Sequence, residues 1–483
     1  MNIRISILLI ASSLLLLLAI GLSSSLPAPQ KKPPARLNIL LFIADDWGFP
    51  HAGIYGDKTA RTPHFDSLAR HGALFQNAFC AASSCSPSRA AILTGRYPHQ
   101  LEAGANLWSY LPKKFPVYPD LLAKAGYRTG YTEKGWGPGG GWMPGWKSDP
   151  EGYASNPAGP HFTSFDEFLT TQPAGEPFCF WYGPKTPHRP YKKGIGLAAG
   201  YRPEQVTVPP YLADTPAVRE DLLDYYQQVE TLDMALGKAL EALRKAGQLE
   251  NTLIIVTSDN GHPFERAKTN EYDAGSRVPL LVYQPGRIKP SRWPQLINLL
   301  DLHATILDAA GLKPDARLPS RSWWPALTQD KPPKADAVFL EREAHYFADS
   351  KNLVIGQNRL SYPVRAIRTT EYLYIQNLRP DRWPGHIPET DEEAQVLENG
   401  KTAVPASPAY FRWLAFGKRP AEELYSVQKD PHQLRNLAML PAYKGLKTRL
   451  RKRLMDWRTA TADPRIINPA DDSFDTYPIF RAN

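Results

Sequence analysis

The chain has 483 residues, of which 42% are hydrophobic and 22% are charged, so it is long enough for one large domain and a smaller one. Three cysteines are too few for a disulfide scaffold, which leaves an ordinary apolar core as the source of stability. The formal net charge of +9 suits a polyanionic substrate, and it suits a soluble basic protein nearly as well. Because no nucleic-acid motif accompanies this charge, we expect no nucleic-acid partner.

The first 25 residues have the pattern of a secretory signal. Arg4 precedes an apolar run over residues 5–22, and three serines follow that run. Because roughly 17–20 apolar residues span a bilayer, an uncleaved membrane anchor is the alternative. We predict a signal peptide over residues 1–25, a linker rich in proline and lysine over 26–36, and an exported protein, periplasmic or secreted. We expect the protein to contact a membrane only if the signal peptide is not cleaved.

Apolar runs alternate with helical patterns through the first three-fifths of the chain. This alternation predicts an α/β fold with a large, mostly parallel sheet flanked by helices. The expected strands are Leu37–Ala44, Gly126–Tyr131, Glu176–Tyr182, Thr252–Thr257 and Val278–Tyr283. The expected helices are Asp66–His71, Pro119–Ala125, Val218–Ala246 and Leu299–Ala310.

A linker-like stretch at Pro332 and Pro333 precedes a different pattern, in which strands follow one another without helices between them. The expected elements are a strand over Ala337–Leu340, a hairpin over Val364–Leu378, a strand over Glu423–Tyr425 and an amphipathic helix over Lys444–Trp457 that packs on this small sheet. We place the large domain at residues 37–358 and a smaller C-terminal α+β domain with an antiparallel sheet at 359–483.

Cys85 lies in the segment Ser84-Cys85-Ser86-Pro87-Ser88-Arg89-Ala90-Ala91-Ile92-Leu93-Thr94-Gly95. Pro87 suits the first helical position, Ser86 a cap and Gly95 the helix end, so we expect Cys85 at a helix N-terminus. The helix dipole and free N–H groups favour an anion there, and Arg89 adds a planar cation suited to a tetrahedral oxyanion. A lone cysteine is more often a small buried apolar residue, but this polar neighbourhood favours a reactive site.

Carboxylates follow two of the predicted strands. Asp45 and Asp46 come directly after Leu37–Ala44, and Asp259 and Asn260 follow Thr252–Thr257. Open α/β sheets bind ligands at the carboxyl ends of their strands. Each pair taken alone is more often a polar turn. Together they supply three carboxylates and an amide oxygen, a set that suits Ca²⁺ or Mg²⁺ rather than zinc.

The segment around Cys85 matches C-x-P-S-R-x-x-x-L-T-G at every fixed position and so resembles the active-site motif of the type I sulfatases. The resemblance implies an alkaline-phosphatase-like sulfatase fold, with residues 37–358 as the catalytic domain. It implies that a maturation enzyme converts Cys85 to formylglycine, whose hydrated aldehyde is the nucleophile. The family's metal ligands fall on Asp45, Asp46, Asp259 and Asn260, and the modified Cys85 completes the shell around Ca²⁺, with Mg²⁺ as the alternative.

Lys134 matches the lysine of the family's G-K-x-H segment, which implies that it neutralises a sulfate oxygen. Here Glu133 replaces the glycine and Trp136 replaces the histidine, the residue to which proton transfer at the nucleophile is assigned. His262, just after Asn260, is a candidate substitute, and an ordinary loop histidine is the simpler interpretation.

His188 matches the last histidine of the family's H-x-P-H segment, whose first histidine is Lys185 here. The match implies that His188 binds the sulfate and protonates the leaving group. Lys268 matches the second basic residue that binds sulfate, and a solvated surface lysine is the alternative. Cys85, Arg89, Lys134, His188 and Lys268 are thus the implied catalytic residues.

Within the family the chain most resembles the heparan N-sulfatases, in the segments Ser83–Ala90, Pro187–Arg189, Thr257–Phe264, Lys268–Asn270 and Ser361–Arg365. This resemblance implies a sulfated saccharide substrate, with N-sulfoglucosamine of heparan-type glycans as the leading candidate. An O-sulfatase on another sulfated polysaccharide, a phosphate or phosphonate hydrolase of the same superfamily, and a non-catalytic glycan-binding protein with an unmodified Cys85 are the alternatives. The candidates for the substrate pocket are His99, Glu102, Asn106, Trp108, Glu343 and His345.

Overall fold

A computed structural model of the chain describes residues 36–137, 151–329, 331, 335–345, 361–385, 391–469 and 471–477. The predicted signal peptide and all of the predicted linker except Arg36 lie outside the described residues. Within the described ranges, no helix is long and apolar enough to cross a membrane.

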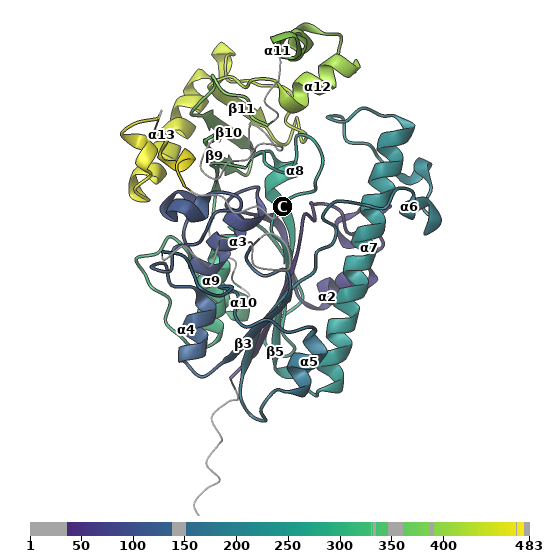
Figure 1. The fold of residues 1–483 in the computed structure, drawn as a ribbon, viewed down its shortest axis with the longest axis vertical. Helices are drawn as coiled ribbons and strands as arrows, with labels where there is room; N and C mark the ends of the chain where they lie inside the picture. The colour runs from purple at the N-terminus through teal and green to yellow at the C-terminus, as the bar shows by residue number, and fades with distance from the viewer. Residues whose placement is uncertain are drawn as a thin grey trace, which may run out of the picture. The chain divides into compact units, whose positions relative to one another are not determined.

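A seven-stranded sheet forms the centre of the larger part, in the order β3-β4-β1-β5-β6-β2-β7 (Figure 1). Neighbouring strands are parallel except at β6, which runs antiparallel to both β5 and β2. The predicted α/β fold with a mostly parallel sheet is therefore confirmed. The strands are β1 (Asn38–Ala44), β2 (Ala73–Phe79), β3 (Arg128–Glu133), β4 (Phe178–Gly183), β5 (Thr252–Ser258), β6 (Arg277–Tyr283) and β7 (Ser291–Asn298).

Helices cover both faces of this sheet, which explains why β1 is a continuous run of buried apolar residues. One core joins Ile39 and Leu41 of β1 to the face that carries α3, α4 and α9, and the other joins Leu40 and Phe42 to α2, α5 and α7 (Figure 1). The helices are α2 (Pro63–His71), α3 (Cys85–Thr94), α4 (Tyr118–Lys124), α5 (Phe165–Thr170), α6 (Ile195–Ala198), α7 (Pro216–Lys245), α8 (Asp273–Ser276), α9 (Leu302–Ala309) and α10 (Trp324–Gln329).

Two strands of this sheet, β2 and β7, have no counterpart among the predicted elements. β7 contains Pro294 and pairs with β2 alone among the described strands. A proline cannot donate to a ladder and is tolerated at a sheet edge, so it masks the strand pattern there. β2 carries Gln76 and Asn77 at its centre, where the pairing register shifts.

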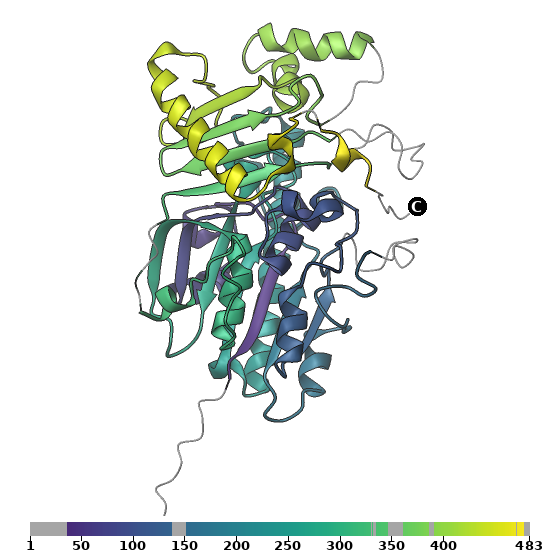
Figure 2. The ribbon, with the colours of Figure 1, turned by 90° about the vertical axis from the view of Figure 1, so that its left-hand side faces the viewer.

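A second sheet of four antiparallel strands has the order β11-β10-β9-β8. Its strands are β8 (Ala337–Arg342), β9 (Val364–Thr369), β10 (Tyr372–Asn377) and β11 (Glu422–Ser426). α13 (Lys444–Ala460) lies across this sheet, as predicted, with Leu450, Leu454 and Trp457 in the same apolar cluster as Ile367 and Tyr374 (Figure 2). β8 belongs to this second sheet although it precedes residue 359. The domain boundary predicted at residue 359 stays a proposal.

One prediction for this region is wrong. Two helices, α11 (Asp391–Asn399) and α12 (Pro408–Phe416), lie between β10 and β11, where strands without intervening helices were expected. Ser407 caps α12, since its side chain accepts a hydrogen bond from the backbone N–H of Tyr410, and Pro408 occupies the first helical position. The C-terminal end of α12 forms part of the cavity described below.

Candidate active site

Cys85 is the first residue of α3 and only 4% exposed. The N-cap is Ser84 rather than Ser86, and the helix begins two residues before Pro87, which a first turn tolerates because its N–H groups need no helical acceptor. Gly95 ends the helix in the left-handed conformation, as expected, with φ of 67°. The predicted placement of Cys85 at a helix N-terminus is therefore confirmed.

Four neighbouring parallel strands deliver the other predicted site residues to one edge of the large sheet. In the sheet order β3-β4-β1-β5, Lys134 follows β3, His188 follows β4, Asp45 and Asp46 follow β1, and Asp259 and Asn260 follow β5. Parallel strands end at the same edge, so residues more than two hundred positions apart in the chain become neighbours.

Asp45, Asp46, Cys85 and His188 each place a ligand atom within 4.8 Å of the others. Asp46 has a left-handed backbone, with φ of 73°, a strained conformation for a residue with a side chain. The backbone N–H of Asp46 donates to Oδ1 of Asp259 at 3.1 Å, and Nδ2 of Asn260 donates to Oδ1 of Asp46 at 2.8 Å. Asp259 and Asn260 are thus both hydrogen-bonded to Asp46, and a ligand atom of Asp45 lies within 4.8 Å of one of Asp46.

Two oxygens of this group are buried without a hydrogen-bond partner: Oδ1 of Asp45 and Oδ1 of Asn260. A buried polar atom with no partner is costly, so such atoms mark a missing ligand. An amide oxygen and carboxylates are hard donors of the kind that Ca²⁺ and Mg²⁺ prefer. The residues therefore fit an oxygen-bound divalent cation.

Two lysines lie against these carboxylates. Nζ of Lys134 donates to Oδ2 of Asp45 at 2.6 Å, and Nζ of Lys268 donates to Oδ2 of Asp46 at 2.8 Å. Burial lowers the pKa of both ammonium groups, but the neighbouring carboxylates raise it by more, so both lysines stay charged. The alternative of a solvated surface side chain does not hold for Lys268, which is largely buried.

His188 faces the thiol of Cys85. Its Nδ1 contacts the backbone carbonyl of Arg189, which leaves Nε2 toward the cluster, 3.8 Å from Oδ2 of Asp46. Burial lowers the pKa of His188, but a hydrogen bond with Cys85 and the charges of Asp45 and Asp46 raise it to about 9. Burial raises the pKa of Cys85, whereas Lys134, Lys268 and that hydrogen bond lower it below the usual value.

Arg89 is completely buried and lies behind the cluster rather than in the wall of the cavity. Its Nε donates to Oδ2 of Asp259 at 2.7 Å, and its other nitrogens donate to the carbonyls of Ala44, Lys134 and Gly135. Arg89 thus ties together the ends of β1, β3 and β5. The geometry suits a residue that positions Asp259 and Lys134.

The structure explains two departures from the family pattern. Trp136 is 1% exposed, and its Nε1 donates to the carbonyl of Ser86 in the first turn of α3 at 3.0 Å. Glu133 accepts a hydrogen bond from the backbone N–H of Lys185 at 3.3 Å. Both residues thus connect elements around the site.

His262 does not replace the missing histidine. Its Nε2 is 2.8 Å from the hydroxyl of Tyr211, and its ring packs against His51, Tyr225 and Phe264. Burial lowers its pKa well below the usual value. The candidate role of His262 as a base at Cys85 is therefore wrong, because its ring lies inside this aromatic cluster.

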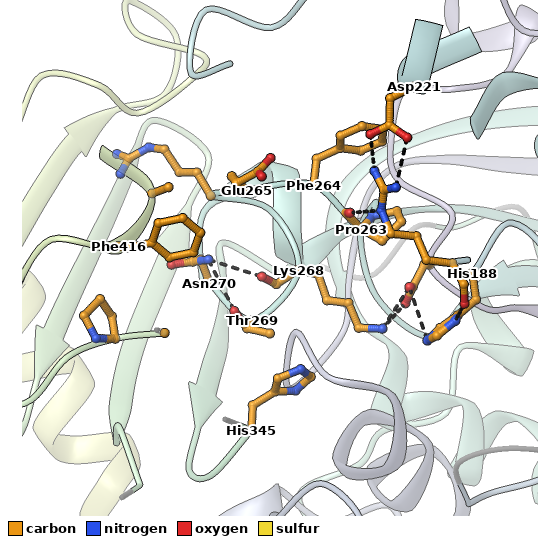
Figure 3. Close-up of a pocket in the computed structure, with 16 residues that line it drawn as sticks. His188, Asp221, Pro263, Phe264, Glu265, Lys268, Thr269, Asn270, His345 and Phe416 are labelled. Carbon is orange, nitrogen blue, oxygen red and sulfur yellow. Dashed lines mark hydrogen bonds and ion pairs between the residues drawn. The ribbon is translucent and has the colours of Figure 1, made fainter. Parts of the chain in front are cut away.

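A cavity of about 470 Å³ opens over the cluster, with His188 and Lys268 at one end (Figure 3). Asp46 lies against both of them. Phe264, Glu265 and Asn270 from the segment after β5 line it, and Phe416 at the end of α12 closes the side opposite His188 (Figure 3). Arg189 and Asp221 form an ion pair with two hydrogen bonds at its edge. The cavity is thus lined both by loops that follow strands of the large sheet and by α12, which lies between two strands of the second sheet in the chain.

Of the six predicted pocket residues, His345 alone lies in the described wall, where its Nδ1 is 2.8 Å from Oγ of Ser84. His99 and Glu343 are buried in ion pairs, with Glu341 and with Arg365 respectively, so their prediction as pocket residues is wrong. Asn106 is buried and donates to the carbonyl of Phe474. Trp108 lies near the start of α3, where its backbone N–H donates to Oγ of Ser86. Glu102 forms an ion pair with Lys114 at the surface.

Several residues of the cavity wall were not predicted, among them Asp221, Glu265, Asn270 and Phe416. Asn270 lies two positions after Lys268, so proximity to a predicted site residue was the available signal. Asp221 and Phe416 come from helices whose ends carry no motif. Only the folded chain brings them to the cavity.

Comparison with known proteins decides the family. Residues 37–312 match the sulfatase family, and the chain is 33% identical to human N-sulphoglucosamine sulphohydrolase over 94% of each chain. The chain belongs to the sulfatase family. This sulfatase is therefore a hydrolase of sulfuric esters or sulfamates, as predicted, and it is also 28% identical to an ulvan-active sulfatase of Formosa agariphila over 94% of this chain and 80% of that one.

Solved structures show the same fold. A protein in complex with its substrate D-glucosamine-2-N,6-O-disulfate superimposes on this sulfatase with a TM-score of 0.64 at 19% identity, covering 89% of this chain and 98% of that one. The phosphonate monoester hydrolase of Agrobacterium radiobacter gives a TM-score of 0.62 at 19% identity, covering 93% and 100%. The predicted alkaline-phosphatase-like sulfatase fold is confirmed.

Proposed function

We propose that this protein is an exported sulfatase that removes sulfate from a sulfated saccharide, with N-sulfoglucosamine of heparan-type glycans as its substrate. The similarity to N-sulphoglucosamine sulphohydrolase over nearly the whole of both chains supports this substrate. An O-sulfated polysaccharide is the alternative, favoured by the similarity to an ulvan-active sulfatase. Export rests on the signal pattern of residues 1–25.

The observation that carries the proposal is the placement of Cys85 beside two unpartnered oxygens and two lysines in one buried cluster. A cysteine that only fills space in a core behaves as a small apolar residue and is surrounded by apolar side chains. Asp45, Asp46, Asp259 and Asn260 would hold a Ca²⁺ or Mg²⁺ ion, with the residue at position 85 beside it. A hydrated formylglycine at that position would supply a hydroxyl nucleophile, and the cation a positive charge for a sulfate oxygen.

The remaining residues of the cluster bind the sulfate and stabilise its charge. Lys134 and Lys268 are buried cations within reach of Cys85, since both lower the pKa of its thiol. In a site closed to water, fixed positive groups stabilise the charge that develops on the sulfuryl oxygens. Arg89 keeps Asp259 and the backbone of Lys134 in place from behind.

His188 is the proton donor for the leaving group. Its side chain is 39% exposed, whereas the carboxylates beneath it are buried, so it connects the cluster to the open cavity. When the bond between sulfur and the sugar nitrogen or oxygen breaks, the proton of Nε2 passes to that departing atom. The contact of Nδ1 with the carbonyl of Arg189 orients the ring for this transfer.

Sulfate release by the purified, matured protein tests this proposal. We would compare N-sulfoglucosamine with O-sulfated glucosamine and galactose before and after removal of divalent cations with a chelator. The proposal expects release from N-sulfoglucosamine, loss of release after chelation and its recovery with Ca²⁺. Release of sulfate only from an O-sulfated sugar would overturn the proposal that N-sulfoglucosamine is the substrate. Undiminished release after exhaustive chelation would overturn the proposal that the reaction needs a divalent cation.

A further inference from the structure

Glu265 is an exposed carboxylate in the wall of the cavity. It lies between the rings of Phe264 and Phe416 in the close-up view (Figure 3). Among the described residues, no hydrogen bond or ion pair engages its carboxylate. Its negative charge is one of those that raise the pKa of Arg189, but no hydrogen bond from a described residue holds the carboxylate, so it can also act on a ligand in the cavity.

The arginines beside Glu265 have other partners. Arg189 donates to both carboxylate oxygens of Asp221 and, through Nε, to the carbonyl of Pro263 at 3.0 Å. Arg266 is buried, donates to the carbonyl of Gln433 and lies 3.9 Å from the ring centre of Tyr272. Asp221 neutralises the first arginine, and the second has its guanidinium directed into the protein.

The cations that suit sulfate are gathered at the opposite end of the cavity. Lys268 lies in the wall there, in contact with Asp46, and Lys134 is buried outside that wall, in contact with Asp45. A sugar held at that end by one sulfate extends toward Glu265, because a cavity of about 470 Å³ is of the size that encloses one small ligand. The part of the sugar ring that is not being desulfated thus lies near the carboxylate of Glu265.

We infer that Glu265 makes this sulfatase selective for sugars with a single sulfate and against sugars with a second sulfate on the same ring. A hydroxyl donates a hydrogen bond to the carboxylate, whereas a sulfate in its place puts two negative charges together. The inference rests on the proposed function, since it assumes that a sulfated sugar occupies the cavity.

Glu265→Gln tests the inference because it removes the charge and keeps the size. We would measure kcat/KM for N-sulfoglucosamine and for glucosamine N,6-O-disulfate, and compare their ratio in wild type and variant. A like charge about 4 Å away in a solvated cavity predicts a shift of at least roughly fivefold in favour of the disulfated sugar. Glu265→Lys should shift the ratio further in the same direction.

The matched control is Glu176→Gln, which removes an exposed carboxylate just before β4, at the end of that strand remote from the site. Its ratio should equal that of the wild type. If the wild type turns over both sugars and the ratio of their kcat/KM values is unchanged in both Glu265 variants, the inference is overturned and the proposed function stays intact. Absence of turnover of any sulfated sugar by the matured wild type would overturn the proposed function, and the inference with it.

Discussion

Arg89 was predicted as a catalytic residue, but its contacts are with protein groups behind the cluster. We predict that Arg89→Ala lowers kcat/KM by about a hundredfold, because misplacing the groups that a positioning residue holds can cost that much. The substitution leaves Asp259 as a buried carboxylate without its cation and frees the carbonyls of Lys134 and Gly135. Steady-state kinetics on the best sulfated sugar provide the measurement.

Arg89→Lys is the matched control, since it keeps the charge near Asp259 and loses most of the carbonyl contacts. We expect an intermediate rate and Ca²⁺ affinity closer to wild type than in Arg89→Ala. A rate near that of wild type in the alanine variant would remove Arg89 from the site altogether.

Asn260 provides a direct test of the cation site. Its Oδ1 is buried without a partner, so Asn260→Ala should weaken Ca²⁺ binding at least about tenfold, comparable to losses seen at metal sites. Calcium titration monitored by calorimetry measures this affinity. Asn270→Ala, which alters an amide in the cavity wall instead, should leave it unchanged. Equal Ca²⁺ affinity in wild type and Asn260→Ala would contradict the proposed ligand set.

At the scale of elements, α3 depends on a contact from the segment that follows β3. Trp136 donates to the carbonyl of Ser86 in the first turn of that helix. Trp136→Phe removes this hydrogen bond, and we predict a loss of about 1 kcal/mol in the free energy of unfolding with kcat/KM retained within a few-fold. Urea unfolding and kinetics on the same preparation measure both. A large loss of kcat at unchanged stability would instead give the indole a chemical role.

The sequence was sufficient to predict the elements that hold the cluster, because each is marked by its own pattern. Continuous apolar runs identify the central strands, and the carboxylates after β1 and β5 identify their carboxyl ends. The motif around Cys85 places the cysteine at a helix start, although it misplaces the first residue of the helix. Lys134, His188 and Lys268 carry no such local signal and were identified by their match to segments of the family.

The cavity wall could not be predicted to the same degree, because it depends on contacts between distant segments. Phe416 reaches it through α12, a helix that was not expected, and Asp221 through the first turns of α7. Conversely, the resemblance to the heparan N-sulfatases implied that His99 and Glu343 line a pocket, but folding pairs them with the buried side chains of Glu341 and Arg365. The sequence shows that these side chains are polar and leaves open which partner each one contacts.

At the scale of the whole molecule, a buried ionic network joins the second sheet to the segment that follows α13. Glu343 accepts hydrogen bonds from Arg365 at 2.7 Å and from Arg465 at 2.8 Å, and all three side chains are completely buried. We predict that Glu343→Ala costs about 3–5 kcal/mol of unfolding free energy, because it leaves buried charges without a partner. Urea unfolding measures this cost.

Glu102→Ala is the control for that prediction. Glu102 pairs with Lys114 at the surface, so its loss should cost no more than about 1 kcal/mol. Similar losses in the two variants would show that the buried network does not support the fold more than an exposed pair does.

The cation should also stabilise the whole fold, since its ligands come from two strands that are brought together only in the native state. At a free Ca²⁺ concentration a hundredfold above the dissociation constant, we expect a gain of about 2.7 kcal/mol. Thermal unfolding with chelator and with increasing Ca²⁺ measures it. A melting temperature that does not depend on Ca²⁺ in the wild type would contradict the site.

The mass of the peptide that contains Cys85, from protein made in a host that matures other sulfatases, tests the central claim most directly. The proposed function predicts the mass of an aldehyde at position 85 together with sulfate release from a sulfated sugar. It also predicts that Cys85→Ala abolishes that release. An unmodified thiol in a protein that nonetheless releases sulfate, or an aldehyde in a protein that releases none from any sulfated sugar, would contradict it.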